Sequence, residues 1–190
     1  MGNSEKRRLA IFGCGYVGGE LARQAMARGF EVTALTRNAT TGDALRNAGI
    51  HMVAADLATD DWHSEMTGPF DHVLNAVSSG GAGLAGYERS YVGGMQSIQR
   101  WAQATGPHGT LVYTSSTAVY PQDGGMRVPE TCSTEGAGER AQISLKTEKL
   151  AETMAFQRVF ILRLAGIYGP GRHDVLDQVR TGEISGRGEH

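Results

Sequence analysis

The chain has 190 residues, of which 40% are hydrophobic and 20% are charged, and its formal net charge is −2. This length can bury one sizeable core, and the composition is typical of a globular protein rather than a disordered one. The weak charge argues against a nucleic-acid partner or an anionic membrane surface, and no apolar run approaches the roughly 18 residues of a membrane span. Two cysteines form no disulfide framework and fit a cytoplasmic protein, and the scattered histidines predict no metal site.

Short apolar runs alternate with helical patterns along the chain. We expect strands at 8–13, 31–37, 51–56, 72–78, 109–116 and 159–166, and helices at 18–28, 42–48, 87–105 and 139–157. Such alternation predicts an α/β fold, with a doubly wound parallel sheet of the Rossmann type in a single domain over 1–190. A last helical pattern at 173–180 precedes a polar tail, so we expect the chain to lack most of a C-terminal substrate lobe.

The segment "FGCGYVGG" at 12–19 carries the strongest functional signal. Gly13, Gly15 and Gly18 fit the pattern G-x-G-x-x-G directly after a predicted strand and at the start of a predicted helix. This arrangement brings backbone amides, including those near Tyr16 and Val17, to a dinucleotide diphosphate at a helix N-terminus. The sequence therefore predicts a nicotinamide dinucleotide site, with an S-adenosylmethionine site as the main alternative.

The end of the second predicted strand bears on the choice of cofactor. An enzyme that prefers NAD usually carries Asp or Glu there to hold the ribose 2′-hydroxyl. This chain has Thr36 and Arg37 instead, and an arginine can pair bidentately with a 2′-phosphate. We expect NADP rather than NAD, and the alternative is that Arg37 is simply exposed at a strand end.

Three segments together, "IFGCGYVGG", "TSSTAVYP" and "LRLAGIYGPGR", resemble the extended short-chain dehydrogenase/reductase family, also called the NAD-dependent epimerase/dehydratase family. The resemblance covers essentially the whole chain. It implies that Asp56 lies near the adenine and that Ala76 and Val77 line the nucleotide cleft. It also implies roles near the nicotinamide for Gly166 and Ile167.

The same resemblance implies that Ser116 is the catalytic Ser/Thr of the family and that the neighbouring Ser115 helps to bind the cofactor. The family's Tyr-x-x-x-Lys helix is only partly matched. Aligning Lys149 with the ribose-binding lysine places Leu145 at the tyrosine position, and choosing Lys146 places Gln142 there. Neither residue can relay a proton at neutral pH, so the chain is similar to the atypical branch of the family.

Two further interpretations concern the predicted helix at 139–157. Lys146 and Lys149 can instead belong to a solvated helix face, supported by Glu148 and Glu152 at neighbouring-turn spacings. Family members often pair through helices that correspond to 87–105 and 139–157, so the resemblance also implies a possible homodimer.

Two functions remain open from the sequence. The first is an NADP-dependent oxidoreductase or epimerase/dehydratase-like enzyme that acts on a carbonyl or sugar-nucleotide substrate with a substitute proton donor. Candidate donors are Tyr120, Tyr168 and Tyr91, with Ser116 as a hydrogen-bond donor to the developing oxyanion. The second is a non-catalytic NADP(H)-binding sensor or interaction module, which the missing tyrosine favours.

Overall fold

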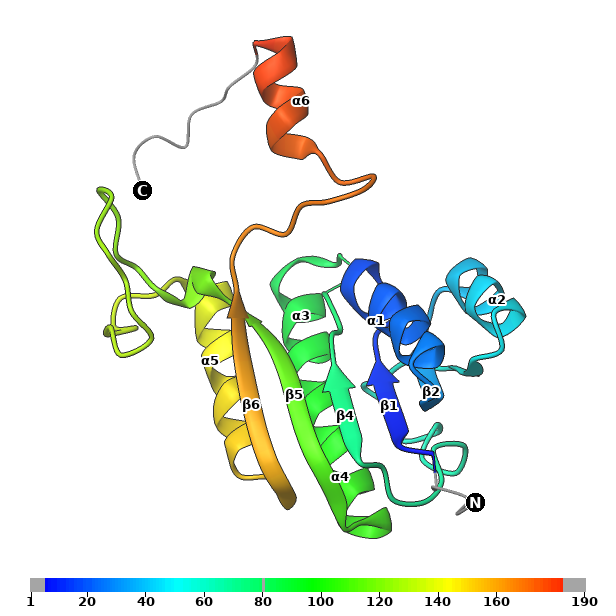
Figure 1. The fold of residues 1–190 in the computed structure, drawn as a ribbon. Helices are drawn as coiled ribbons and strands as arrows, with labels where there is room; N and C mark the ends of the chain where they lie inside the picture. The colour runs from blue at the N-terminus through cyan, green and yellow to red at the C-terminus, as the bar shows by residue number, and fades with distance from the viewer. Residues whose placement is uncertain (1–5, 80, 183–190) are drawn as a thin grey trace.

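A computed structural model of the protein describes residues 6–79 and 81–182. It contains a six-stranded parallel sheet in the order β3-β2-β1-β4-β5-β6 (Figure 1). The strands are β1 (Arg8–Phe12), β2 (Glu31–Thr36), β3 (His51–Ala54), β4 (His72–Asn75), β5 (His108–Ser116) and β6 (Phe156–Leu164). The order changes direction between β1 and β4, so the predicted doubly wound Rossmann-type sheet is confirmed. Residues 1–5 and 183–190, at the ends of the expected 1–190 domain, lie outside the described residues.

Helices cover both faces of the sheet because its strands are apolar on both sides. The helices are α1 (Tyr16–Ala27), α2 (Ala39–Asn47), α3 (Gly83–Glu88), α4 (Gly94–Thr105), α5 (Glu139–Glu152) and α6 (Asp174–Thr181). Successive residues of β1 enter different cores: Leu9 and Ile11 pack with α1 and α2, and Ala10 and Phe12 pack with α4 and α5. This alternation is the period of two that a strand imposes on its side chains.

Two predicted element boundaries are wrong, and each has a local cause. The helix predicted at 139–157 ends at Glu152, because Phe156 already pairs with His108 as the first residue of β6. The helix predicted at 42–48 begins at Ala39. There the Asn38 side chain accepts a hydrogen bond from the Thr41 N–H at 2.9 Å, which is an ordinary N-cap.

The helix predicted at 87–105 is also more complex than its pattern. It begins at Gly83, and a π-helical turn, η1 (Arg89–Gly93), separates α3 from α4. A π turn inserts an extra residue into the helical repeat, so side chains on its two flanks point in directions that α-helical spacing does not predict.

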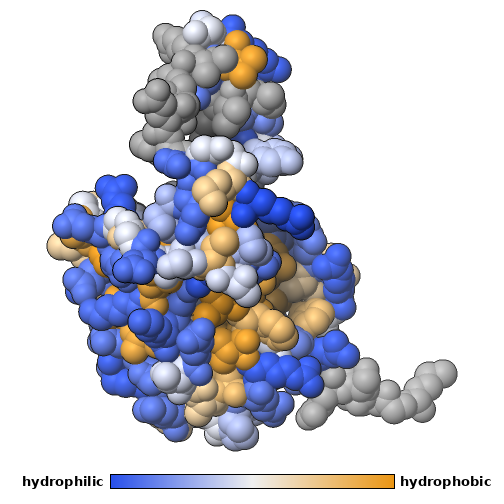
Figure 2. Space-filling model, turned by 90° about the vertical axis from the view of Figure 1, so that its left-hand side faces the viewer, coloured by the Kyte–Doolittle hydropathy of each residue, from blue (hydrophilic) through white to orange (hydrophobic). Residues whose placement is uncertain are grey.

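β6 forms one edge of the sheet, and its two faces differ. Val159 and Ile161 pack against the core on the α5 side, whereas Phe160 and Leu162 on the opposite side are 52% and 46% exposed. Figure 2 looks at the left-hand side of Figure 1, where β6 and α5 lie, and shows hydrophobic residues gathered in the middle of that face. In the described part of the chain, this side of β6 is therefore open to solvent.

Candidate nucleotide-binding site

The glycine-rich turn between β1 and α1 has a backbone that larger residues cannot reproduce. Gly13 has φ of +90°, and a Cβ atom there would lie 2.7 Å from the nitrogen of Val77, in the segment after β4. A Cβ at Gly18 would overlap the Gly13 carbonyl oxygen, so Gly18 lets the first turn of α1 pack against the end of β1. These two glycines build the turn, as the pattern G-x-G-x-x-G predicts.

Gly15 differs, because a Cβ at this position would meet nothing within 4 Å. Its lack of a side chain is therefore not needed for packing, and it leaves open space in front of the N-terminus of α1. Gly15 is the N-cap of α1, no side chain of the described residues caps the helix, and its first turn holds no acidic residue. Unpaired N–H groups and the positive end of the helix dipole thus face this space, which fits a dinucleotide diphosphate.

A cavity of about 440 Å³ opens from this turn along the carboxyl ends of the strands. Seven residues of the sequence prediction line it: Gly13, Gly15, Thr36, Arg37, Asp56, Ala76 and Val77. Ligands of doubly wound sheets bind at this edge, where the strand order changes direction. The predicted adenosine and diphosphate residues are therefore brought together in one cleft.

Asp56 holds the positive charges of this cavity in place. Its Oδ2 lies 3.8 Å from Nη1 of Arg37 and accepts a hydrogen bond from Nη2 of Arg89 at 3.1 Å. Its Oδ1 accepts from the Ala58 N–H at 3.0 Å. Partial burial opposes ionisation, but the Ala58 N–H and the two guanidinium groups outweigh it and lower the pKa of Asp56. The carboxylate is therefore charged at neutral pH.

Cys14 also lines the cavity but is not a reactive thiol. Its side chain is 2% exposed, its Sγ lies 3.6 Å from the Leu35 carbonyl oxygen, and burial raises its pKa to about 12. A thiol that stays protonated is a poor nucleophile, so Cys14 fills space in the turn.

Tyr120, predicted to be catalytic, and Ser115, predicted to bind the cofactor, lie on the β5–β6 side and are engaged in a different network. Arg163 on β6 bonds both carboxylate oxygens of Glu148 on α5, at 3.1 and 2.8 Å, and the Ser115 hydroxyl donates to Glu148 at 2.5 Å. The Tyr120 hydroxyl accepts from Arg163 at 2.6 Å and donates to the Glu130 carbonyl at 3.1 Å. Ser115 and Tyr120 are thus tied to the packing of α5 on the sheet.

Lys149 and Ser116 do not line the 440 Å³ cavity either. Lys149 borders a second hollow of about 470 Å³ between α5 and residues 133–135, together with Gln142, Leu145 and Lys146. Lys146 forms an ion pair with Glu88 of α3 at 2.9 Å. The Ser116 hydroxyl accepts from the Ala118 N–H at 3.1 Å and caps the short 3₁₀ helix η2 (Thr117–Val119). The assignment of Glu148 to a solvated helix face is wrong, since its residue exposure is 4%.

The loop after β6 returns to the glycine-rich turn. Tyr16, at the start of α1, is 41% exposed and its hydroxyl lies against Gly169, while the Arg172 guanidinium sits 5.7 Å from its ring. Gly166 and Ile167 belong to this loop but do not line the cavity. Val17 follows Tyr16 in the first turn of α1 and is also outside the cavity lining.

The other two candidate proton donors lie in contrasting surroundings. Tyr91 stacks on Tyr87 at 4.4 Å, and burial together with its neighbour Tyr87 raises its pKa. Tyr168 is 86% exposed. Neither tyrosine lines the cavity in the described residues, so the source of a proton stays a prediction.

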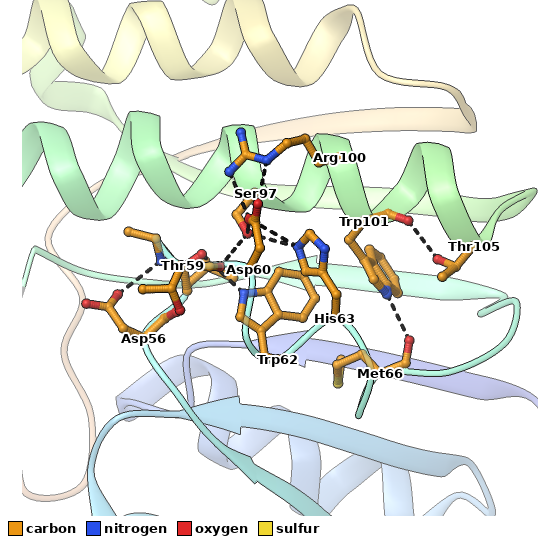
Figure 3. A network of polar contacts seen from close by, with 12 residues as sticks. Asp56, Thr59, Asp60, Trp62, His63, Met66, Ser97, Arg100, Trp101 and Thr105 are labelled. Atoms are coloured by element: carbon orange, nitrogen blue, oxygen red, sulfur yellow. Dashed lines mark hydrogen bonds and ion pairs between the residues drawn. The ribbon is translucent and has the colours of Figure 1, made fainter.

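A second polar cluster resembles a Ser–His–Asp arrangement but cannot act as one (Figure 3). His63 Nε2 lies 3.0 Å from the Ser97 hydroxyl and 3.4 Å from Asp60, so one nitrogen faces both partners and no relay through the ring exists. Ser97 is fully buried and also bonds the Thr59 carbonyl. With Arg100 bound bidentately to Asp60, this cluster ties the loop that carries Asp56 to α4.

Several residues at the cavity were not predicted from the sequence. Ser78 and Ser90 line it, as do Asn38 and Thr41 of the α2 cap. Asn38 could have been recognised as an N-cap directly after a strand. Ser90 and its neighbour Arg89 reach the site from the π-helical turn, which the 3.6-residue periodicity hides.

Two kinds of feature are absent from the described residues. They contain no group of three or more His, Cys, Asp or Glu side chains placed to hold a metal ion. None of their helices has both the length and the apolar character needed to cross a bilayer.

The model of the NAD-dependent epimerase/dehydratase family matches residues 10–181, and the chain belongs to this family. A Synechocystis sp. protein named as a candidate dihydroflavonol 4-reductase is 31% identical over 180 residues, which cover 90% of this chain and 51% of that protein. YeeZ of Escherichia coli K12 is 27% identical over 97% of this chain and 66% of its own length. The chain thus spans about half to two thirds of these relatives.

Solved structures share the fold at low identity. WbmG of Bordetella bronchiseptica, in complex with NAD, matches with a TM-score of 0.77 and 17% identity over 95% of this chain and 61% of its own. A UDP-galactose 4-epimerase matches with a TM-score of 0.72 and 18% identity over 92% and 63% of the two chains.

Proposed function

We propose that the chain binds NADP(H) in the 440 Å³ cavity and works as an oxidoreductase or sugar-nucleotide epimerase/dehydratase-like protein. The observation that carries the proposal is the uncapped N-terminus of α1 facing open space at Gly15. The cavity continues from there to Arg37, which is half-exposed and lies at the end of β2. A guanidinium in this place supports a 2′-phosphate and hence NADP over NAD.

In this proposal each part of the chain has a stated task. The backbone of the glycine-rich turn holds the diphosphate, and Arg37 holds the 2′-phosphate. A bound nicotinamide supplies or accepts a hydride. Ser116, at the end of β5, would donate a hydrogen bond to the substrate oxygen, and Lys149 would reach the nicotinamide ribose. The substrate would be a small carbonyl compound or a sugar nucleotide, and the structurally similar UDP-galactose 4-epimerase supports the second class.

A non-catalytic NADP(H)-binding module is the second candidate. It is favoured by Leu145 at the position of the family's tyrosine and by the engagement of the Tyr120 hydroxyl with Arg163 and Glu130. In such a module, cofactor occupancy would change contacts with a partner and no substrate would turn over.

Turnover separates the two candidates. NADPH oxidation should be followed with a panel of carbonyl compounds and sugar nucleotides, for the wild type and for Leu145→Tyr. The enzyme proposal predicts measurable turnover by the wild type, or turnover restored by Leu145→Tyr but not by Gln142→Tyr one turn earlier on α5. Tight NADPH binding with no turnover in any variant would contradict the enzyme and support the binding module.

A further inference from the structure

Two arginines from distant parts of the chain meet at the adenosine end of the cavity. Arg37 follows β2 and Arg89 begins the π-helical turn, yet both guanidinium groups approach the same oxygen, Oδ2 of Asp56. Their side chains remain 49% and 56% exposed. Two positive charges therefore share one carboxylate, and among the described residues each keeps donors free for another acceptor.

The π-helical turn brings Arg89 to this place. Ser90, the next residue, lines the cavity and donates to the Ser79 carbonyl at 3.2 Å, which fixes the turn against the segment after β4. π turns interrupt regular helices at functional sites more often than elsewhere, because they redirect neighbouring side chains. The position of Arg89 thus follows from the backbone and not only from the flexibility of its side chain.

We propose that Arg89 is a second specificity-determining residue, which together with Arg37 binds the 2′-phosphate of NADP(H). The inference rests on the proposed cofactor function and extends it. A 2′-phosphate offers three acceptor oxygens, so it can bridge two guanidinium groups that a single carboxylate already holds close together. Asp56 keeps both arginines at the cavity, and its own negative charge opposes the incoming phosphate.

Affinities for NADPH and NADH test the role of Arg89. In calorimetric titrations, Arg89→Gln should weaken NADPH binding roughly 10- to 100-fold, the usual worth of a charge-assisted hydrogen bond, and leave NADH binding nearly unchanged. Arg46→Gln is the matched control, because it removes the same charge from a similarly exposed arginine that pairs with Asp43 on α2 and does not line the cavity. Arg46→Gln should alter neither affinity. Arg89→Lys, which keeps the charge but not the fork, should fall between wild type and Arg89→Gln.

Asp56→Asn should change the affinity for NADPH in the opposite direction. If the arginines bind a phosphate, removing the neighbouring negative charge should tighten NADPH binding relative to NADH. The same comparison with 2′,5′-ADP and 5′-ADP isolates the 2′-phosphate from the nicotinamide half.

The outcomes separate this inference from the proposed function. If the wild type prefers NADPH and Arg89→Gln weakens both nucleotides equally, Arg89 contacts the adenine or the fold alone, and the inference is overturned while the cofactor assignment stands. If the wild type prefers NADH or binds neither nucleotide, the cofactor assignment fails and the inference fails with it.

Discussion

Two regions at the carboxyl ends of the strands differ in how their arginines are paired with carboxylates. Beside β1, β2 and β4, Arg37 and Arg89 share the single carboxylate of Asp56 and stay about half exposed. Beside β5 and β6, Arg163 bonds both oxygens of Glu148, and the Glu148 side chain is only 5% exposed. Unshared donors near solvent suit an incoming anion, whereas a saturated buried pair suits support of the fold. The comparison predicts that substitutions in the first region affect binding and those in the second affect stability.

The largest expected effect is a loss of stability at the Arg163–Glu148 pair. Glu148→Ala leaves the Arg163 guanidinium partly buried without its carboxylate and the Ser115 hydroxyl without its acceptor. Breaking a buried pair in this way costs about 3–5 kcal/mol of unfolding free energy, measured by urea denaturation. Cofactor affinity should not change. The control is Glu152→Ala, one turn later on α5 and exposed to solvent. If Glu148→Ala loses less than about 1 kcal/mol, the Arg163–Glu148 pair behaves like a surface ion pair, and the comparison is contradicted.

The next largest effect is expected at acid pH, which should lower the unfolding free energy through a buried histidine of β5. His108, at the start of β5, is 1% exposed and stacks on Trp101 at 4.3 Å. Its Nδ1 accepts from the Phe70 N–H at 3.2 Å, so a proton on that nitrogen would remove the bond, and burial lowers its pKa from 6.5 to about 4.

The unfolded chain therefore binds more protons than the folded one between these two pKa values. Stability from neutral His108 is complete above about pH 6.5 and falls as the pH drops toward 4, by up to about 3 kcal/mol. Unfolding free energies measured across this window should show the fall in the wild type. His108→Gln should flatten the profile, and an unchanged slope in that variant would exclude His108 as its source.

The glycine-rich turn should respond more moderately in stability. Gly13→Ala forces a side chain into φ of +90° and against the Val77 nitrogen, which should lower the unfolding free energy by about 1–3 kcal/mol. The melting temperature measures this effect. An unchanged melting temperature would show that the turn rearranges freely, and the cavity then would not be preformed.

The smallest effect is expected on the exposed face of α5. Lys146→Ala removes the ion pair with Glu88, whose two side chains are more than half exposed, so the unfolding free energy should change by less than about 0.5 kcal/mol. Comparison with Glu148→Ala, two residues away on the same helix, sharpens the contrast between a solvated pair and a buried one. A loss as large as that of Glu148→Ala would contradict it.

The sequence was most informative where a local pattern dictates geometry. The alternation of apolar runs predicted the sheet, and the spacing of Gly13, Gly15 and Gly18 predicted the turn that opens onto the cavity. Arg37 was found because the end of the second strand has a fixed place in this fold.

Features that depend on long-range contacts were not predictable in this way. Glu148 follows a run of polar residues on α5 and fits a solvated face, yet its partner Arg163 lies 15 residues further on in β6. Arg89 and Asp56 are 33 residues apart and meet because a π turn alters the helical repeat. Neither the pairing nor the extra residue in the turn leaves a periodic signal in the sequence.

One measurement tests the central claim that a dinucleotide diphosphate binds at the N-terminus of α1. Calorimetric titration with NADPH and NADH should show binding to the wild type, with NADPH preferred. Gly15→Ala should lose that binding at an unchanged melting temperature, because a Cβ there meets no atom of the described residues within 4 Å and only fills the space in front of the helix. Absence of heat at millimolar nucleotide with the wild type, or equal binding by Gly15→Ala, would contradict the claim.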